Sequence, residues 1–216
     1  MKKIFDLNNP VWRFIGRLAD FFVLSILWYI CAALIIPLGA GSTALSNVSL
    51  SMVDNTEGYI TRSFFKAFRS SFKKASVIWL ILLCFGLVLC ADFYWIFFGN
   101  PGVGIYFLPA AAVLAVIYIV SLAFIFPYLS KSDLGIKDSL LGGISLALKN
   151  FIPVFSYTML FVGIMLFGIF VFKAVLFVAP GLLSYVSSFI VRRIFMKYGI
   201  ASDSSRNESE ISGENN

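Results

Sequence analysis

The chain has 216 residues, of which 60% are hydrophobic and 13% are charged, and its mean hydropathy is +0.92. Soluble globular proteins carry about 25% charged residues, so this composition excludes an ordinary soluble domain. A net charge of +6 would favour nucleic-acid binding in a soluble protein. Here the cations lie between apolar segments, as in cytoplasmic loops of membrane proteins, and we expect no nucleic-acid partner.

Long uncharged segments predict an all-α fold, a polytopic transmembrane helical bundle. Residues 21–53 carry no charge, and residues 75–130 carry a single one. Two further uncharged segments follow at 150–172 and 174–191. A membrane-spanning helix needs about 20 apolar residues, so each of these segments can hold at least one membrane helix.

The N-terminal segment predicts a helix start followed by a first span. Asn9 is a suitable N-cap, and Pro10 suits the first helical position. Arg17 and Asp20 are three residues apart, so they share a helix face and can pair. The first span is predicted over Leu18 to Ile36, where a proline ends it.

A serine-rich segment, Ser42 to Val53, is predicted to form a short helix buried among other spans, since hydroxylic and small residues permit close packing. Thr43, Asn47 and Asp54 lie within an arc of roughly 40°. This polar stripe favours interhelical hydrogen bonding, and a substrate path is the alternative. The predicted apolar side, which can meet lipid, consists of Ala44, Leu45, Val48 and Met52.

The distribution of cations sets the expected topology. If the serine-rich helix crosses the membrane, every strongly basic segment falls on the cytoplasmic side. This gives about six membrane helices with both termini in the cytoplasm. Five spans with an external N-terminus is the alternative. We expect one membrane domain over residues 1–199 and a disordered polar tail over residues 200–216.

The segment Thr61 to Ser76 holds five cations and four phenylalanines in 16 residues. On a helix, the phenylalanines occupy an arc of roughly 100° and four of the cations an opposite arc of roughly 60°. We expect an amphipathic helix at the cytoplasmic membrane surface, facing anionic headgroups or a partner protein. The candidate lipid- or partner-facing residues are Arg62, Lys66, Arg69 and Lys73 with Phe64, Phe65, Phe68 and Phe72.

The remaining spans are predicted as two hairpins. Ala75 to Phe98 crosses outward, Gly99 to Gly104 forms a tight external turn, and Ile105 to Tyr128 returns. The second hairpin consists of 150–172 and 174–195. Asp92 is placed near the outer interface of its span, which weakens the usual functional reading of an intramembrane carboxylate.

A weak internal repeat precedes each hairpin. The pattern of serine, four apolar positions and a final lysine starting at Ser63 recurs 76 residues later at Ser139. The second copy therefore predicts another cytoplasmic amphipathic helix, ending near Lys149. The helical period alone also enforces such apolar positions, so chance similarity remains an alternative.

Residues typical of catalysis are missing from the sequence. It contains no histidine, no glycine-rich phosphate loop and no paired catalytic carboxylates. Its three cysteines, Cys31, Cys84 and Cys90, lie in apolar segments, where they act as small hydrophobic residues. We expect no catalytic, cofactor-binding or metal-binding residues and no enzymatic activity.

Three stretches carry a family resemblance: IFDLNNPVWRFIGRLADFF, PLGAGSTAL and EGYITRSFFKAFRSSFKKA. In this order and spacing they resemble the YesL-like family of bacterial integral membrane proteins, over roughly residues 1 to 195. The family has no established activity, and its members are often encoded beside carbohydrate uptake systems. The resemblance implies an accessory role in sugar import, with components of a carbohydrate ABC transporter as partners.

Three functions remain as hypotheses. The first is a non-enzymatic, transport-associated membrane protein that docks partners or lipid through its basic amphipathic helices. The second is a small transporter or channel, with the Thr43, Asn47 and Asp54 stripe facing a cavity. The third is a membrane scaffold or lipid-sensing protein.

Overall fold

The structure, a computed structural model, describes residues 10–54, 56, 58–99, 101–132, 134–170 and 177–199. Within these ranges the chain is entirely helical. The elements are α1 (Pro10–Ala33), α2 (Leu38–Val53), α3 (Ile60–Tyr94), the π-helical turn η1 (Trp95–Gly99), α4 (Pro101–Leu129), α5 (Ile136–Lys149), α6 (Phe151–Phe170) and α7 (Ala179–Lys197). The predicted cap Asn9 and the tail at 200–216 lie outside the described residues, as does Lys173, which separates the two predicted spans of the second hairpin.

Four segments are long and apolar enough to cross a membrane: Gly16–Ala33, Ile60–Gly99, Tyr106–Leu129 and Phe151–Phe170. The fold class, an all-helical protein with several candidate spans, therefore agrees with the prediction from sequence. The serine-rich helix α2 has 16 residues and α7 has 19, and neither is among the candidates. The number of six membrane helices is not confirmed.

The largest departure from prediction is α3. The segment Thr61 to Ser76 is not a separate helix, because α3 runs without a break from Ile60 to Tyr94. The predicted boundary at Ala75 marks a change in polarity, and no glycine or proline interrupts the backbone before Gly86. At 1.5 Å per residue, a 35-residue helix is about 52 Å long, well beyond the roughly 30 Å of bilayer hydrocarbon.

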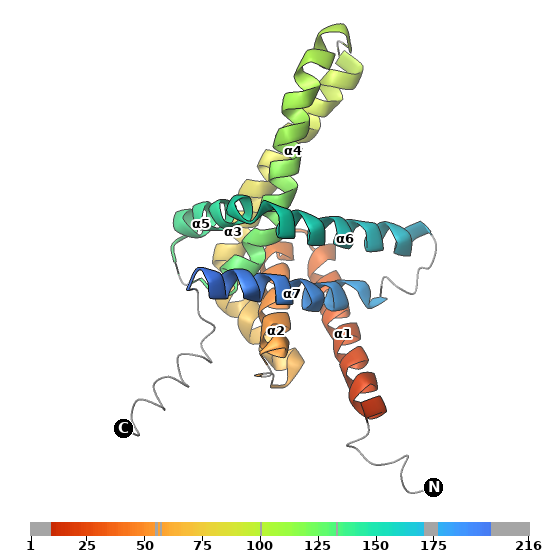
Figure 1. The fold of residues 1–216 in the computed structure, drawn as a ribbon, viewed down its shortest axis with the longest axis vertical. Helices are drawn as coiled ribbons and strands as arrows, with labels where there is room; N and C mark the ends of the chain where they lie inside the picture. Colours follow the sequence, from red (N-terminus) through yellow and green to blue (C-terminus); the bar gives the residue numbers. More distant parts are fainter. Residues whose placement is uncertain are drawn as a thin grey trace, which may run out of the picture.

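The helices α1 and α2 form a hairpin that packs along the first half of α3. Figure 1 shows this hairpin at the base of the molecule, while the second half of α3 and the first half of α4 project away from it. At the turn, Trp79 donates a hydrogen bond from Nε1 to the carbonyl of Ile35, at 2.9 Å. Ile35 has φ 57°, a costly backbone conformation for a β-branched residue. The turn thus lies level with Trp79.

Close approach at this hairpin depends on small residues. A Cβ atom at Gly39 would lie 2.6 Å from the carbonyl oxygen of Ala75, and one at Gly41 would lie 2.6 Å from Cβ of Cys31. Real Cβ atoms do not come this near, so only glycine fits at either place. The start of α2 is therefore in backbone contact with α3, as in other helix pairs joined by small residues.

The helix α2 is buried on both of its faces. The predicted apolar side does not meet lipid: Val48 is 1% exposed and packs with Phe21, Leu24 and Phe64 in one core cluster. The prediction failed because small residues cover all sides of this helix, so that α1, α3, α4 and α7 can all approach it. The other predicted lipid-facing residues are buried as well: Ala44, Leu45 and Met52.

The helices α6 and α7 cross the bundle on one side (Figure 1). The Tyr157 hydroxyl of α6 donates to the carbonyl of Ala123 in α4, at 2.7 Å. The buried Ser25 of α1 accepts a hydrogen bond from the backbone N–H of Gly181, at 2.9 Å. This N–H belongs to the first turn of α7, so α1 supplies the capping oxygen that α7 lacks in its own sequence.

Candidate functional site

The cations predicted to face lipid or a partner do lie on an exposed face of α3. Arg62, Lys66, Arg69 and Lys73 are all exposed, and we call these four residues the α3 cationic surface. Four i, i+3 or i+4 neighbours of one sign repel each other on a helix. An anionic ligand at this surface would relieve that repulsion.

The phenylalanines beside this surface divide into two groups. Phe64 is 1% exposed and packs against α1 and α2, so its predicted contact with lipid is wrong. Its burial follows from the α1–α2 hairpin, which covers that side of α3. Phe65 and Phe72 remain exposed, and Phe68 is half-buried. A shallow groove runs from the rings to the cations, lined by Phe65, Phe68, Arg69, Phe72 and Lys73.

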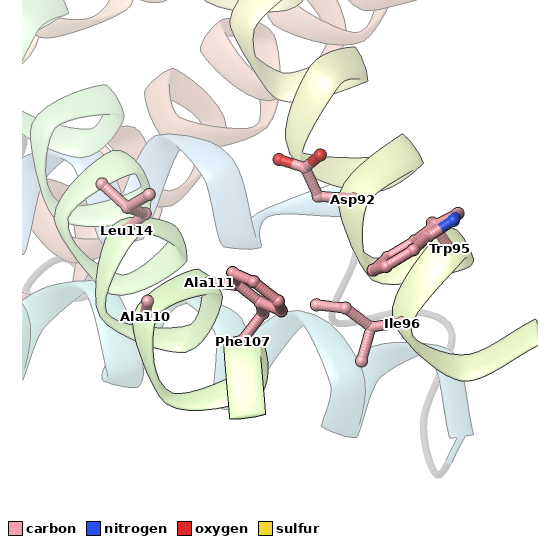
Figure 2. A pocket seen from close by; sticks show the side chains of 7 residues that line it. All are labelled: Asp92, Trp95, Ile96, Phe107, Ala110, Ala111 and Leu114. Carbon is pink, nitrogen blue, oxygen red and sulfur yellow. The ribbon is translucent and has the colours of Figure 1, made fainter. Parts of the chain in front are cut away.

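The two carboxylates inside candidate spans differ in their surroundings. Arg17 and Asp20 do not form the predicted ion pair within the described part of the chain; Arg17 instead donates to the hydroxyl of Tyr185, at 3.4 Å. Asp92 lies on the projecting end of α3 and lines a cavity of about 300 Å³ between α3 and α4, shown in Figure 2.

The predicted polar stripe on α2 has partners within the protein. Thr43 is fully buried, and its hydroxyl donates to the carbonyl of Gly39 in the same helix, at 2.9 Å. Asn47 donates from Nδ2 to the carbonyl of Ser130, just after α4, at 2.9 Å. Asn47 therefore bonds to the segment that follows α4, whereas Thr43 bonds to its own helix.

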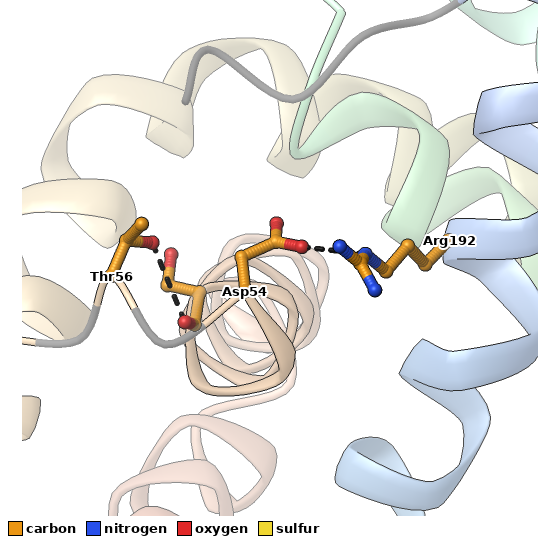
Figure 3. A network of polar contacts seen from close by, with 4 residues as sticks. Asp54, Thr56 and Arg192 are labelled. Carbon is orange, nitrogen blue, oxygen red and sulfur yellow. Dashed lines mark hydrogen bonds and ion pairs between the residues drawn. The ribbon is translucent and has the colours of Figure 1, made fainter. Parts of the chain in front are cut away.

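Asp54, just after α2, forms an ion pair with Arg192 of α7 (Figure 3). The Nε atom of Arg192 lies 2.7 Å from Oδ1 of Asp54, and the Asp54 side chain is 4% exposed against 43% for Arg192. The contact lacks hydrogen-bond geometry, so charge rather than a directed hydrogen bond joins the two groups. Sequence reasoning missed Arg192, because its partner is 138 positions away in the chain.

A second cavity, of about 290 Å³, lies between six helices. The stripe residues do not line it; the α2 residues that do are Leu38, Ser42, Leu45 and Ser46. The Ser42 hydroxyl accepts a hydrogen bond from Nε1 of Trp28, at 3.0 Å. Most other lining residues are apolar, and the lining contains no charged side chain.

Within the described ranges, no group of three or more His, Cys, Asp or Glu side chains gathers that could hold a metal ion. The polar features described above are the α3 cationic surface, the Asp54–Arg192 ion pair, and the mainly apolar cavities that Asp92 and Ser46 line.

Comparison with known proteins finds a family match for one part of the chain. Residues 21–93 match a protein family of unknown function, DUF624. This is the family of YesL-like membrane proteins. The resemblance seen in the sequence is therefore confirmed for a family of unknown function, and the match does not point to YesL in particular. The match covers 73 of 216 residues, which include the second half of α1, all of α2 and nearly all of α3. Neither a curated protein nor a solved structure matches the chain.

Proposed function

We propose that this chain is a non-enzymatic, multi-pass protein of the bacterial cytoplasmic membrane that binds anionic lipid headgroups through the α3 cationic surface. The observation that carries the proposal is the row of four exposed cations beside exposed phenylalanines. Near a membrane surface each cation contributes about 1 kcal/mol to anionic lipid binding, and Arg69 and Lys73, at the end of the row nearest the apolar half of α3, contribute most. The adjoining groove offers rings to the acyl chains and cations to the headgroup.

The length and polarity of α3 also suggest how the chain is arranged in the membrane. If Lys74 marks one headgroup layer, Trp79 lies five residues, about 7–8 Å, further into the bilayer. The α1–α2 turn is level with Trp79, so this hairpin enters the membrane and returns without crossing. The second half of α3 and α4 then form a spanning hairpin. The N-terminus and all the basic segments still share the cytoplasmic side, as the positive-inside rule requires.

The cellular role proposed here is accessory to carbohydrate uptake, with components of a carbohydrate ABC transporter as partners. This part rests on the resemblance to YesL-like proteins. Purification of the protein in a mild detergent from cells grown on different sugars tests it. Co-purification of importer subunits is the expected result, and a preparation that never contains them contradicts this role.

Headgroup binding is tested by the lipid that stays with the purified full-length protein. Replacing Arg62, Lys66, Arg69 and Lys73 together by glutamine should reduce the retained phosphatidylglycerol several-fold, as measured by lipid mass spectrometry. The matched control removes four exposed cations from other helices: Lys137, Lys149, Arg193 and Lys197. Equal loss from both variants would mean that net charge, and not this surface, retains the lipid.

The cavity beside Ser46 favours a transporter or channel as the second candidate function. In a cysteine-free background, a water-soluble, impermeant maleimide tests it on Ser46→Cys and Thr43→Cys. Both positions should react slowly if the protein is a closed bundle. Fast reaction of Ser46→Cys alone would show water in the cavity and would favour the transporter over our proposal.

A further inference from the structure

The cavity at the projecting end of the α3–α4 hairpin combines one charge with aromatic and apolar walls. It has a volume of about 300 Å³, and Asp92 is the only charged residue that lines it. Figure 2 shows the Asp92 carboxylate on the side of α3 that faces α4, and the rings of Trp95 and Phe107 line the same cavity. On the opposite wall, the small residues Ala110 and Ala111 lie between Phe107 and Leu114 of α4 and leave space between these larger side chains.

The Asp92 carboxylate has no partner in the described part of the chain. The single ion pair found there joins Asp54 to Arg192, and no hydrogen bond within the described ranges reaches the Asp92 side chain. The projecting hairpin stands clear of the other helices (Figure 1), so none of them can supply a cation. Asp92 is exposed, and near the bilayer surface an exposed, unpaired carboxylate can attract a cation from water or from a headgroup.

The walls determine which cation fits. A calcium ion needs about six to eight oxygen ligands, whereas this cavity offers one carboxylate among apolar side chains. Aromatic faces attract organic cations, and a carboxylate adds direct charge attraction. A small organic ammonium group with an apolar substituent can therefore use the carboxylate, the two rings and the alanine wall together.

The position of Asp92 along α3 places the cavity where such a ligand can reach it. Asp92 lies 18 residues beyond Lys74, which is about 27 Å along a helix and close to the roughly 30 Å thickness of the hydrocarbon layer. The cavity is then near the headgroup layer opposite the α3 cationic surface. We propose that Asp92, Trp95 and Phe107 form a binding site for an organic ammonium group, either a soluble amine or the ammonium of a lipid headgroup.

Trp95 provides the signal for the test. A full-length protein in which Trp12, Trp28 and Trp79 are replaced by phenylalanine keeps Trp95 as its single tryptophan. In phosphatidylglycerol nanodiscs, butylammonium chloride should change its emission in a saturable manner. Sodium chloride and butan-1-ol at the same concentrations should not. The Asp92→Asn variant should bind butylammonium at least tenfold more weakly.

A second pair of variants keeps the carboxylate in place. Ala111→Leu fills the cavity and should also weaken butylammonium binding at least tenfold, whereas Ala112→Leu, at an exposed neighbour that does not line the cavity, should bind normally. An unchanged response in Asp92→Asn, or an equal response to sodium, would overturn the proposal. So would equal binding by the two alanine variants.

The source of the ammonium group is distinguished by lipid composition. If a lipid headgroup occupies the site, nanodiscs that contain phosphatidylethanolamine should show a shifted Trp95 emission before butylammonium is added. Butylammonium should then change the emission little further. A site open to soluble amines predicts the same titration curve in both kinds of nanodisc. In each case the effect must disappear in Asp92→Asn, or the site is not the one proposed.

Discussion

At the scale of single residues, the ion pair between Asp54 and Arg192 is the contact whose loss should destabilise the fold most clearly. It ties the end of α2 to α7, and the carboxylate is almost fully buried. Removing one partner from a buried pair leaves the other charge unpaired, and that desolvated charge dominates the cost. Arg192 itself is partly exposed, but its loss should lower the stability of the protein because it leaves the buried Asp54 carboxylate unpaired.

Replacing Arg192 by glutamine should therefore lower the free energy of unfolding by about 1–3 kcal/mol, since it strands the Asp54 carboxylate. Thermal unfolding in detergent measures this effect. Arg193→Gln is the control, because Arg193 is exposed and adjacent in sequence. The double variant Asp54→Asn/Arg192→Gln should recover part of the loss. If Arg192→Gln and Arg193→Gln unfold alike, the ion pair does not stabilise the protein.

At the scale of elements, the contact between α2 and α3 organises the base of the molecule. It depends on backbone proximity at one end, where Gly39 touches Ala75, and on an aromatic side chain at the other, where Phe64 enters the core shared with α1 and α2. Both features are consequences of α3 being one continuous helix. A separate helix lying flat at the membrane surface could not reach both ends of α2.

Gly39→Ala should separate these two helices. The new methyl group would meet the Ala75 carbonyl, which belongs to a helix backbone and cannot move aside, so we expect a loss of about 1–3 kcal/mol. Gly163→Ala on α6 is the control, because nothing lies within 4 Å of its added Cβ. That change should be neutral or slightly stabilising. Equal unfolding temperatures for both variants would argue against the close α2–α3 contact.

The two neighbours Phe64 and Phe65 test which face of α3 is covered. Phe64→Ala should cost about 3–5 kcal/mol, because its ring is fully buried. Phe65→Ala should cost much less, since 55% of that residue is exposed. Chemical unfolding of the purified protein measures both values. A greater loss for Phe65 than for Phe64 would mean that α3 is rotated relative to α1 and α2.

At the scale of the whole molecule, the sequence predicted helices better than their arrangement. The apolar runs and the prolines at positions 10 and 37 placed most helices correctly, and the resemblance pointed to the matched family. The boundary at Ala75 was misplaced because polarity changes there while the helix continues. The burial of α2 and the pairing of Asp54 with Arg192 depend on contacts between distant segments, and local patterns carry no information about those.

The central claim of this account is that α3 passes out of the membrane as one helix, with its cationic half at the headgroups and the α1–α2 turn inside the bilayer. Spin labels at positions 34, 62 and 87 of the full-length protein in vesicles, in a cysteine-free background, test this by their accessibility to oxygen and to a water-soluble nickel complex.

We predict that the label at 62 is accessible from water, whereas those at 34 and 87 lie within the hydrocarbon. Accessibility of position 34 to the nickel complex from the side opposite to 62 would contradict the account, since the α1–α2 hairpin would then cross the membrane completely.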